Sequence, residues 1–335
     1  MSNLRAGVAG LANRALRSLG VELVSLNELR GLRAERQGAR FVPPSVSLPD
    51  GARDYLRADN PRLLSLKERY RGHPASVHSQ WAEAGDYLRA ELDLAAFRAD
   101  SAYLYQRREA TDAQYLLAAY YARTRDRLGL WERLSDDDLF GNYTVEFDAA
   151  KRVSRDFNDS VIEINFLERE VGLSGATLLD VGAGYGRLGH RLSEWLPAAS
   201  VFCTDAVPES TFLSEYYLRF RGSRAEVIPL DDVAGFLRSR KVDLVTNIHS
   251  FSECTLASVE WWLDQFAAGG VRHLFLVPNR HEPFTTEADG SGVPLLPHIE
   301  RRGYRLARRV PKYDESGAAR HAAFGATYYL FELRP

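Results

Sequence analysis

The second half of the chain alternates short apolar runs with stretches of helical periodicity. Apolar runs typical of buried strands predict strands at residues 177–181, 200–204, 226–230, 242–248, 273–277, 304–310 and 327–333. Such strand–helix repetition predicts a parallel sheet with right-handed crossovers. Because no convincing helical pattern separates the last two runs, we expect them to pair as an antiparallel hairpin.

The first half is mainly helical in pattern. Residues 1–40 carry an Arg-rich amphipathic stripe, residues 41–61 are rich in turn signals, and residues 79–134 have helical spacing. The stripe is expected to pack on its own protein or a second subunit, with docking on a membrane surface or another partner left open. We therefore expect residues 1–150 to form a helical cap or dimerisation layer, and residues 151–335 to form an α/β domain that begins with an amphipathic helix at 153–171.

An acidic run, Asp136-Asp137-Asp138, precedes the predicted domain. Adjacent carboxylates are more often a solvated turn or helix cap than a metal site, so we expect these side chains to face water. A hard cation such as Mg²⁺ needs clustered oxygen ligands. The end of the predicted fourth strand offers Asn247 and Glu253 and no carboxylate pair. The sequence therefore predicts no dependence on a metal.

Composition narrows the class of protein. The chain has 335 residues, a formal net charge of −2 and two cysteines, Cys203 and Cys254, without a Cys-x-x-Cys spacing. This length allows two domains, and the near-neutral charge does not favour binding to nucleic acid. Reduced thiols, no visible secretory signal and no apolar run near the roughly 18–20 residues of a membrane helix predict a cytoplasmic protein.

The most informative segment follows the first strand and contains alternating glycines: Asp180-Val181-Gly182-Ala183-Gly184-Tyr185-Gly186. Glycine lacks a Cβ and tolerates positive φ, so such a loop lets a ligand lie against the backbone. The spacing of Gly184, Gly186 and Gly189 also matches the dinucleotide fingerprint, which leaves a nicotinamide or flavin enzyme as an alternative. However, a carboxylate at Asp180 would repel pyrophosphate, whereas it suits the ammonium group of an amino-acid-bearing cofactor.

Two further acids end predicted strands in register with the glycine loop. Asp205 follows the second strand and is expected to accept hydrogen bonds from ribose hydroxyls, and Asp231 follows the third and is expected to accept from an adenine amino group. With these residues the chain resembles the class I S-adenosylmethionine-dependent methyltransferases, whose first motif is acid-x-Gly-x-Gly-x-Gly. The resemblance implies a Rossmann-like, seven-stranded sheet with an antiparallel final strand, and S-adenosylmethionine as cofactor. The residues expected to bind it are Asp180, Gly182, Gly184, Tyr185, Gly186, Asp205, Asp231 and Asn247.

The chemistry is expected beyond the carboxyl end of the fourth strand, because ligands of open α/β sheets bind at that edge. There His249, with an ordinary pKa near 6.5, is the candidate general base. Glu253 is expected either to orient His249 or stabilise its charge, or to lie in the first turn of the next helix, where the helix dipole favours an acid. Two alternatives stay open for His249, a hydrogen-bonding role and a purely structural one. Arg280 and His281, after the fifth strand, are candidates for binding the acceptor, with His281 as a reserve base. A solvated loop is the alternative for both residues.

The segment from Asn247 to Glu253 also resembles a family of bacterial sugar O-methyltransferases, which reads roughly Asn-x-x-Ser-Phe-x-Glu, often followed by Met. Cys254 departs from that pattern. The resemblance implies a sugar hydroxyl as acceptor, with Ser250 and Phe251 as candidates to contact it. A position in the apolar core is an equally open alternative for Phe251. A non-sugar O- or N-methyltransferase and a non-catalytic cofactor-binding partner protein are the alternatives.

Overall fold

The computed structural model describes residues 46–77, 94–99, 110–279 and 281–334. The chain divides into two compact units, Met1–Pro44 and Ser45–Pro335, and all described residues belong to the second. The amphipathic stripe predicted at 1–40 and much of the helical region predicted at 79–134 lie outside the described residues.

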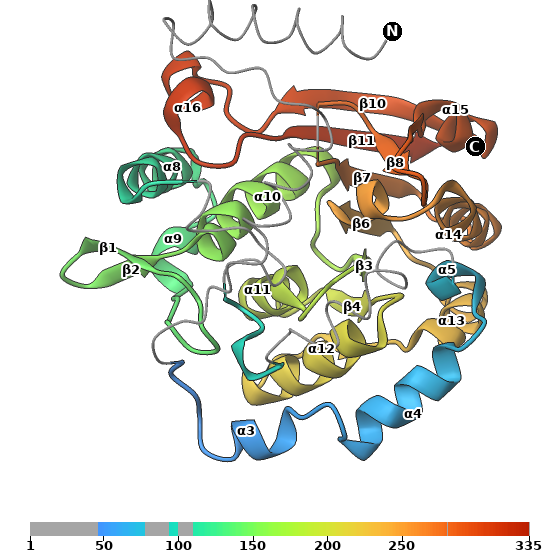
Figure 1. Cartoon of the computed structure of the whole chain (residues 1–335). Helices are drawn as coiled ribbons and strands as arrows, with labels where there is room; N and C mark the ends of the chain where they lie inside the picture. The colour runs from blue at the N-terminus through green and yellow to red at the C-terminus, as the bar shows by residue number, and fades with distance from the viewer. Residues whose placement is uncertain (1–45, 78–93, 100–109, 280, 335) are drawn as a thin grey trace, which may run out of the picture. The chain divides into compact units, whose positions relative to one another are not determined.

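A seven-stranded sheet forms the centre of the described unit (Figure 1). Its order is β10-β11-β7-β6-β3-β4-β5, and only β11 runs antiparallel to its neighbours. The strands are β3 (Thr177–Val181), β4 (Ser200–Thr204), β5 (Glu226–Val227), β6 (Leu244–Ile248), β7 (His273–Val277), β10 (Tyr304–Pro311) and β11 (Thr327–Leu333). This topology confirms the fold class, a Rossmann-like sheet with an antiparallel final strand.

Helices cover both faces of the sheet, as the alternation of buried side chains requires. One apolar core contains Leu179 and Tyr329, and the other contains their chain neighbours Leu178 and Tyr328. The first core includes side chains of α12 (Pro208–Phe220), α13 (Val233–Ser239), α14 (Leu256–Ala268) and α15 (Leu296–Arg301). The second includes side chains of α8 (Asp112–Arg125), α10 (Arg155–Val171) and α11 (Arg187–Trp195).

Two strand predictions need correction. The third strand is only two residues long, because the chain turns at Pro229 into the 3-10 helix η2 (Leu230–Asp232). The final hairpin forms as predicted, but a short helix, α16 (Ser316–His321), interrupts its connection. Six residues are too few to show a clear helical period in the sequence. Two small hairpins, β1 (Val145–Asp148) with β2 (Lys151–Val153) and β8 (Phe284–Thr286) with β9 (Gly292–Pro294), lie outside the main sheet.

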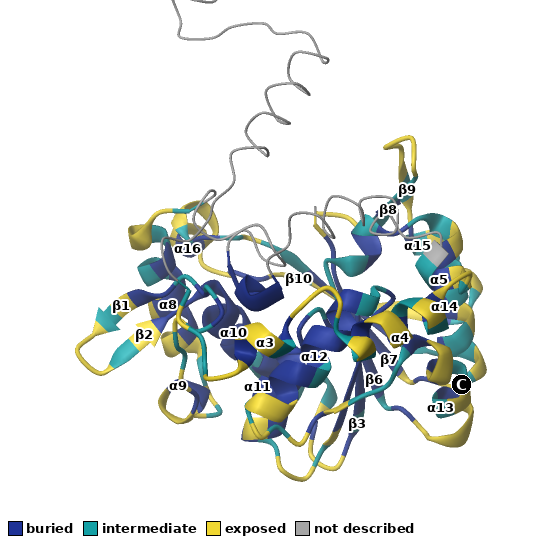
Figure 2. Cartoon of the chain, turned by 60° about the horizontal axis from the view of Figure 1, so that its bottom comes forward, coloured by how far each residue is buried: buried dark blue, intermediate teal, exposed yellow. Residues whose placement is uncertain are grey.

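The described N-terminal segments pack directly on this sheet domain. They comprise α3 (Ala52–Tyr55), α4 (Pro61–Tyr70), α5 (Pro74–Val77) and the 3-10 helix η1 (Leu94–Ala96), with α9 (Leu130–Arg133) after α8. Helix α4 buries Leu63, Leu66 and Tyr70, which lie on one helical face, and contacts α12 (Figure 2). The proposed division at residue 150, with a cap or dimerisation layer, stays a prediction. None of the described helices has the length and apolarity needed to cross a bilayer.

Gly189 provides a test of how closely helix α11 approaches strand β4. A Cβ added at Gly189 would lie 2.3 Å from the Sγ of the buried Cys203, so we expect Gly189→Ala to lower the free energy of unfolding by about 1–3 kcal/mol. Gly235→Ala in α13 is the control, because its Cβ would meet nothing within 4 Å. Urea denaturation would measure both, and Cys203→Ala should relieve the cost at Gly189. Equal stability of the two alanine variants would contradict the close packing.

Candidate functional site

A cavity opens at the carboxyl ends of the central strands β3, β4 and β6. Its walls come from the glycine loop, from the residues after β4 and from the segment after β6. It is lined by Asp180, Gly182, Ala183, Gly184, Tyr185, Arg187, Leu188, Asp205, Ala206, Val207, Ser210, Ile248, His249, Ser250, Glu253 and Cys254. This is the edge at which ligands of open parallel sheets bind.

The glycine loop needs glycine for two separate reasons. Gly182, Gly184 and Gly186 have φ values of +71°, +58° and +85°, which other residues rarely adopt. In addition, a Cβ on Gly182 would lie 2.3 Å from the Ser250 side chain, and one on Gly186 would lie 2.8 Å from the Ser214 hydroxyl. The segment after β6 therefore closes tightly over the loop.

Two buried carboxyl groups face the cavity from neighbouring strands. The Asp180 carboxylate accepts a hydrogen bond from the Thr246 hydroxyl at 2.7 Å, and burial raises its pKa to about 6. The Asp205 carboxylate accepts from the backbone N–H groups of Gly184 and Val207, each at 2.9 Å, and burial raises its pKa to about 7. Both acids are therefore costly to ionise in the ligand-free protein, and a ligand with a cationic group or hydroxyl donors would relieve that cost.

Asn247 and Phe251 have structural contacts next to the cavity. The Asn247 amide donates to the Val181 carbonyl at 2.9 Å and accepts from the Phe251 backbone N–H at 2.9 Å, so it fixes the turn after β6. Phe251 is 3% exposed and belongs to the apolar core, where its ring stacks near Phe266. The structure thus places Ser250 in the cavity wall and Phe251 behind it, and neither has been tested as an acceptor contact.

The two candidate catalytic residues both line the cavity. His249 has a φ of +69°, and its backbone N–H donates to the Val277 carbonyl at 2.7 Å. Burial, together with the nearby cation of Arg155, lowers the pKa of His249 to about 3, so the imidazole is neutral and a weak base. Glu253 accepts a hydrogen bond from the Asn279 side chain at 3.0 Å.

Two candidates, Asp231 and His281, lie away from the cavity lining. Asp231 is exposed and forms an ion pair with Arg69 of α4 at 2.8 Å, so an adenine amino group would compete with that cation. His281 is exposed, does not line the cavity, and its carbonyl accepts from the Tyr329 hydroxyl at 2.5 Å. Arg280 lies outside the described residues.

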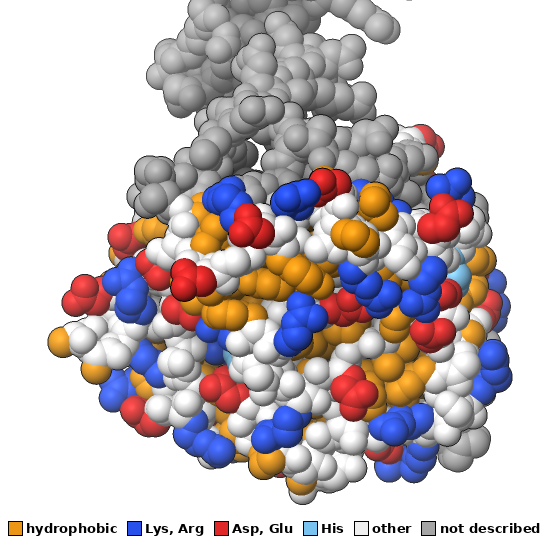
Figure 3. Space-filling model, turned by 90° about the horizontal axis from the view of Figure 1, so that it is seen from below, with side chains coloured by type: hydrophobic (Ala, Val, Ile, Leu, Met, Phe, Trp, Pro, Cys, Tyr) orange, Lys and Arg blue, Asp and Glu red, His pale blue; other side chains and the backbone are white. Residues whose placement is uncertain are grey.

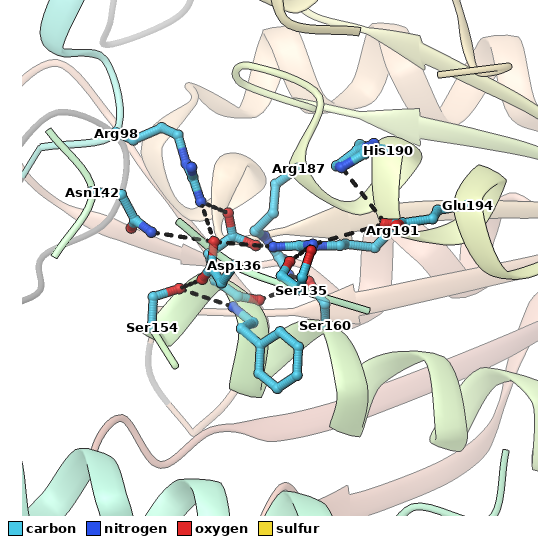
Figure 4. Close-up of polar contacts among 12 residues, drawn as sticks. Arg98, Ser135, Asp136, Asn142, Ser154, Ser160, Arg187, His190, Arg191 and Glu194 are labelled. Carbon is cyan, nitrogen blue, oxygen red and sulfur yellow. Dashed lines mark hydrogen bonds and ion pairs between the residues drawn. The ribbon is translucent and has the colours of Figure 1, made fainter. Parts of the chain in front are cut away.

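A buried charge network that was not predicted from the sequence joins α10 to the segments of Arg98, Asp136 and Arg191 (Figure 4). The Tyr185 hydroxyl, in the glycine loop, donates to the Asp156 carboxylate at 2.7 Å. Arg98 lies 3.1 Å from the same carboxylate and Arg191 lies 3.6 Å from it. Tyr185 therefore directs its hydroxyl to α10, which does not favour the predicted contact with a cofactor.

The prediction that Asp136 faces water is wrong. Its side chain is 1% exposed and binds Arg98 at 2.8 Å and Arg191 at 3.2 Å, and it accepts from the Ser154 hydroxyl and the Asn142 amide. Burial is possible because arginines from two distant segments converge on it. A sequence signal did exist for the network as a whole: Asp156, Asp159 and Glu163 recur at helical spacing within the apolar stripe of the predicted helix 153–171.

Within the described residues, no group of three or more His, Cys, Asp or Glu side chains is arranged to hold a metal ion. Neither a protein-family model nor a curated protein sequence matches the chain. The solved structures that it resembles include several methyltransferases, at low identity.

An S-adenosylmethionine-dependent methyltransferase from Clostridium acetobutylicum is 14% identical, with a TM-score of 0.39 over 52% of this chain and 91% of that one. A second, from Aquifex aeolicus, is 19% identical, with a TM-score of 0.39 over 51% and 89%. Magnesium protoporphyrin IX methyltransferase from Synechocystis, solved with S-adenosylmethionine bound, is 15% identical, with a TM-score of 0.39 over 67% and 99%. At these scores the likeness says nothing about the substrate or activity of this chain.

The raised pKa of Asp180 predicts a specific pH dependence of stability. Folding raises this pKa from 3.8 to about 6, so the wild-type protein loses stability as pH rises through that interval. Asp180→Asn has no proton to lose. The free energy of unfolding of Asp180→Asn minus that of the wild type should therefore increase by roughly 2–3 kcal/mol between pH 4 and pH 7.5. Urea denaturation at the two pH values would measure this difference. A difference that stays constant with pH would show that Asp180 is not buried as described.

Proposed function

We propose that the chain is an S-adenosylmethionine-dependent O-methyltransferase. The observation that carries the proposal is the buried Asp180 carboxyl at the end of β3, beside three glycines with positive φ. A carboxylate in that place favours an ammonium group and disfavours a pyrophosphate, which separates this cofactor from the dinucleotides. S-adenosylmethionine carries both an ammonium group and ribose hydroxyls, and so could satisfy Asp180 and Asp205 together.

The protein's own contribution is positioning. When bound, the cofactor supplies an electrophilic methyl group and its leaving group, so the chain must hold an acceptor oxygen in line with that methyl and exclude water. The backbone of Gly182 and Gly184 would support the amino-acid end, and Asp205 would accept from the ribose. Arg187 lines the same cavity, but its guanidinium is bound to Glu163 at 2.8 Å, which directs it toward α10.

For the acceptor we propose a hydroxyl of a sugar or of a glycosylated substrate. Support comes from the polar cavity wall, where Ser250, His249 and Glu253 offer hydroxyl, imidazole and carboxylate groups. Glu253 is the candidate to receive the proton of the acceptor hydroxyl. The expectation that His249 does so is untested, and its surroundings favour the different role argued below.

The alternatives are a non-sugar acceptor and a cofactor-binding protein without activity. A nucleic acid is a weaker candidate, because the net charge is −2 and acidic and basic side chains are interspersed on the face seen in Figure 3. The cytoplasmic location and the homodimer remain predictions.

Calorimetric titration tests the cofactor assignment. Asp180→Asn should weaken S-adenosylmethionine binding by about 10- to 100-fold, because a hydrogen bond between charged groups contributes about 1.5–3 kcal/mol. Asp232→Asn is the matched control, since Asp232 is exposed and does not line the cavity. Binding of a nicotinamide nucleotide in place of S-adenosylmethionine would contradict the assignment.

Turnover with a panel of sugars, nucleotide sugars and glycosides tests the reaction. We expect methyl transfer to a hydroxyl, and Glu253→Gln should reduce kcat by about 100-fold or more if Glu253 takes the proton. A protein that binds the cofactor but methylates nothing in the panel would favour the binding-protein alternative. Methylation of a nitrogen or of a non-sugar acceptor alone would contradict the acceptor class.

A further inference from the structure

His249 has an environment that is unusual for a general base. It follows β6 with φ +69° and ψ −36°, a conformation that non-glycine residues rarely adopt and that costs energy to hold. The backbone hydrogen bond to Val277 keeps it there. Strain of this kind is often retained at functional sites, where the surrounding structure holds a side chain in one position. The surroundings of the two ring nitrogens of His249 therefore indicate what the side chain can do.

Arg155 faces one of the two ring nitrogens of His249. Its Nη2 lies 3.5 Å from Nε2 of His249. A guanidinium can only donate hydrogen bonds, so the nitrogen that faces it must present a lone pair. A neutral imidazole with its lone pair on Nε2 carries its proton on Nδ1. The contact is long, but a proton on Nε2 would set two donors against each other.

The other nitrogen, Nδ1, has no hydrogen-bond partner among the described residues, and it is buried. A buried N–H group without a partner is costly. Nδ1 is covered in the ligand-free protein, but His249 lines the cavity, so a ligand that enters beside the ring and uncovers Nδ1 would recover that cost. His249 thus combines a fixed tautomer, an unused donor and a place in the cavity wall.

We propose that His249 is a hydrogen-bond donor to the acceptor substrate: its Nδ1–H donates to an acceptor oxygen, and Arg155 is the positioning residue that keeps the proton on Nδ1. The inference rests on the proposed function in one respect, namely that the acceptor enters this cavity. It replaces proton removal by His249 with orientation of the acceptor. No proton leaves or joins the imidazole during methyl transfer.

The charged groups around His249 agree with a neutral ring. Arg155 from α10, Arg187 from α11 and Lys312 after β10 oppose its protonation, while Asp159 from α10 favours it. Asp159 is itself shared by Lys312 and by Arg155, which lies 3.4 Å away. Arg155 also lies over the ring of Phe324, 3.9 Å from its centroid, which fixes the guanidinium next to the imidazole.

The direct test is nitrogen NMR of the ligand-free protein labelled with ¹⁵N-histidine. The signals of His249 are identified by their loss in His249→Asn. We expect a neutral ring with the proton on Nδ1 and no titration between pH 5 and pH 8. A proton on Nε2, or a titration near pH 6.5, would overturn the proposal. This result does not depend on any activity, so it stands even if the proposed methyl transfer fails.

Arg155→Met tests the positioning role. We expect the pKa of His249 to rise toward its ordinary value of 6.5 and the Nε2-protonated ring to appear in the NMR spectrum, because the opposing cation and donor are gone. Arg169→Met is the control on the same helix, since Arg169 is exposed and pairs with Glu170. An unchanged His249 spectrum in Arg155→Met would overturn the role of Arg155. Should that variant not fold, the wild-type spectrum still decides the tautomer.

Activity separates the two roles of His249 once an acceptor is found. The amide nitrogen of asparagine reaches the position of Nδ1, so a donor role predicts that His249→Asn retains about 10-fold more activity than His249→Ala. Loss of a general base would instead lower kcat by about 100- to 10,000-fold in both variants alike. Equal losses of that size in both folded variants would contradict the donor role, and thermal melting would establish that both are folded.

Discussion

The Asp156 carboxylate on α10 holds the glycine loop in place. It accepts from the Tyr185 hydroxyl within that loop and lies beside the buried guanidinium groups of Arg98 and Arg191. Burial alone would raise its pKa, but the charges of Arg191, Arg98 and Arg187 hold that pKa well below its ordinary value. Asp156 is therefore ionised at every physiological pH, and removing a partner from such a buried group costs about 3–5 kcal/mol.

This carboxylate supports a loop that contains three glycines with positive φ. Glycine gives the backbone its freedom, and Tyr185 removes that freedom by anchoring the middle of the loop to α10. Asn247 and Ser250 then close over the loop from β6. The cavity is thereby shaped in advance, which lowers the entropic cost of binding.

The acids that remain in the cavity behave differently from those of α10. Asp180 and Asp205 have raised pKa values because burial is not offset by a paired cation, whereas Asp156 is surrounded by arginines. The structure thus contains buried carboxyl groups with paired cations on α10 and buried carboxyl groups without them in the cavity. That contrast is the reason for which we propose that the cofactor binds at Asp180.

The sequence predicted those features that depend on residues close together along the chain. The strands, the glycine loop and the acids at the ends of β3 and β4 follow local patterns, and the structure brings Asp180, Asp205 and His249 to one cavity. It could not predict pairings between distant segments. Arg98 and Asp156 are separated by 58 positions, and Arg69 and Asp231 by 162. The sequence therefore did not show that Asp136 is buried, or that Asp231 lies outside the cavity and pairs with an arginine. The sequence left Phe251 open between the acceptor pocket and the core, and its neighbours in space place it in the core.

A crystal structure of the chain with S-adenosylhomocysteine tests the central claim most directly. The account predicts that the ligand's amino group lies within ion-pair distance of Asp180, that its ribose hydroxyls bind Asp205, and that the glycine loop keeps its ligand-free shape with Tyr185 on Asp156. A ligand bound at another edge of the sheet, or a glycine loop rebuilt around it with Tyr185 detached, would contradict the account.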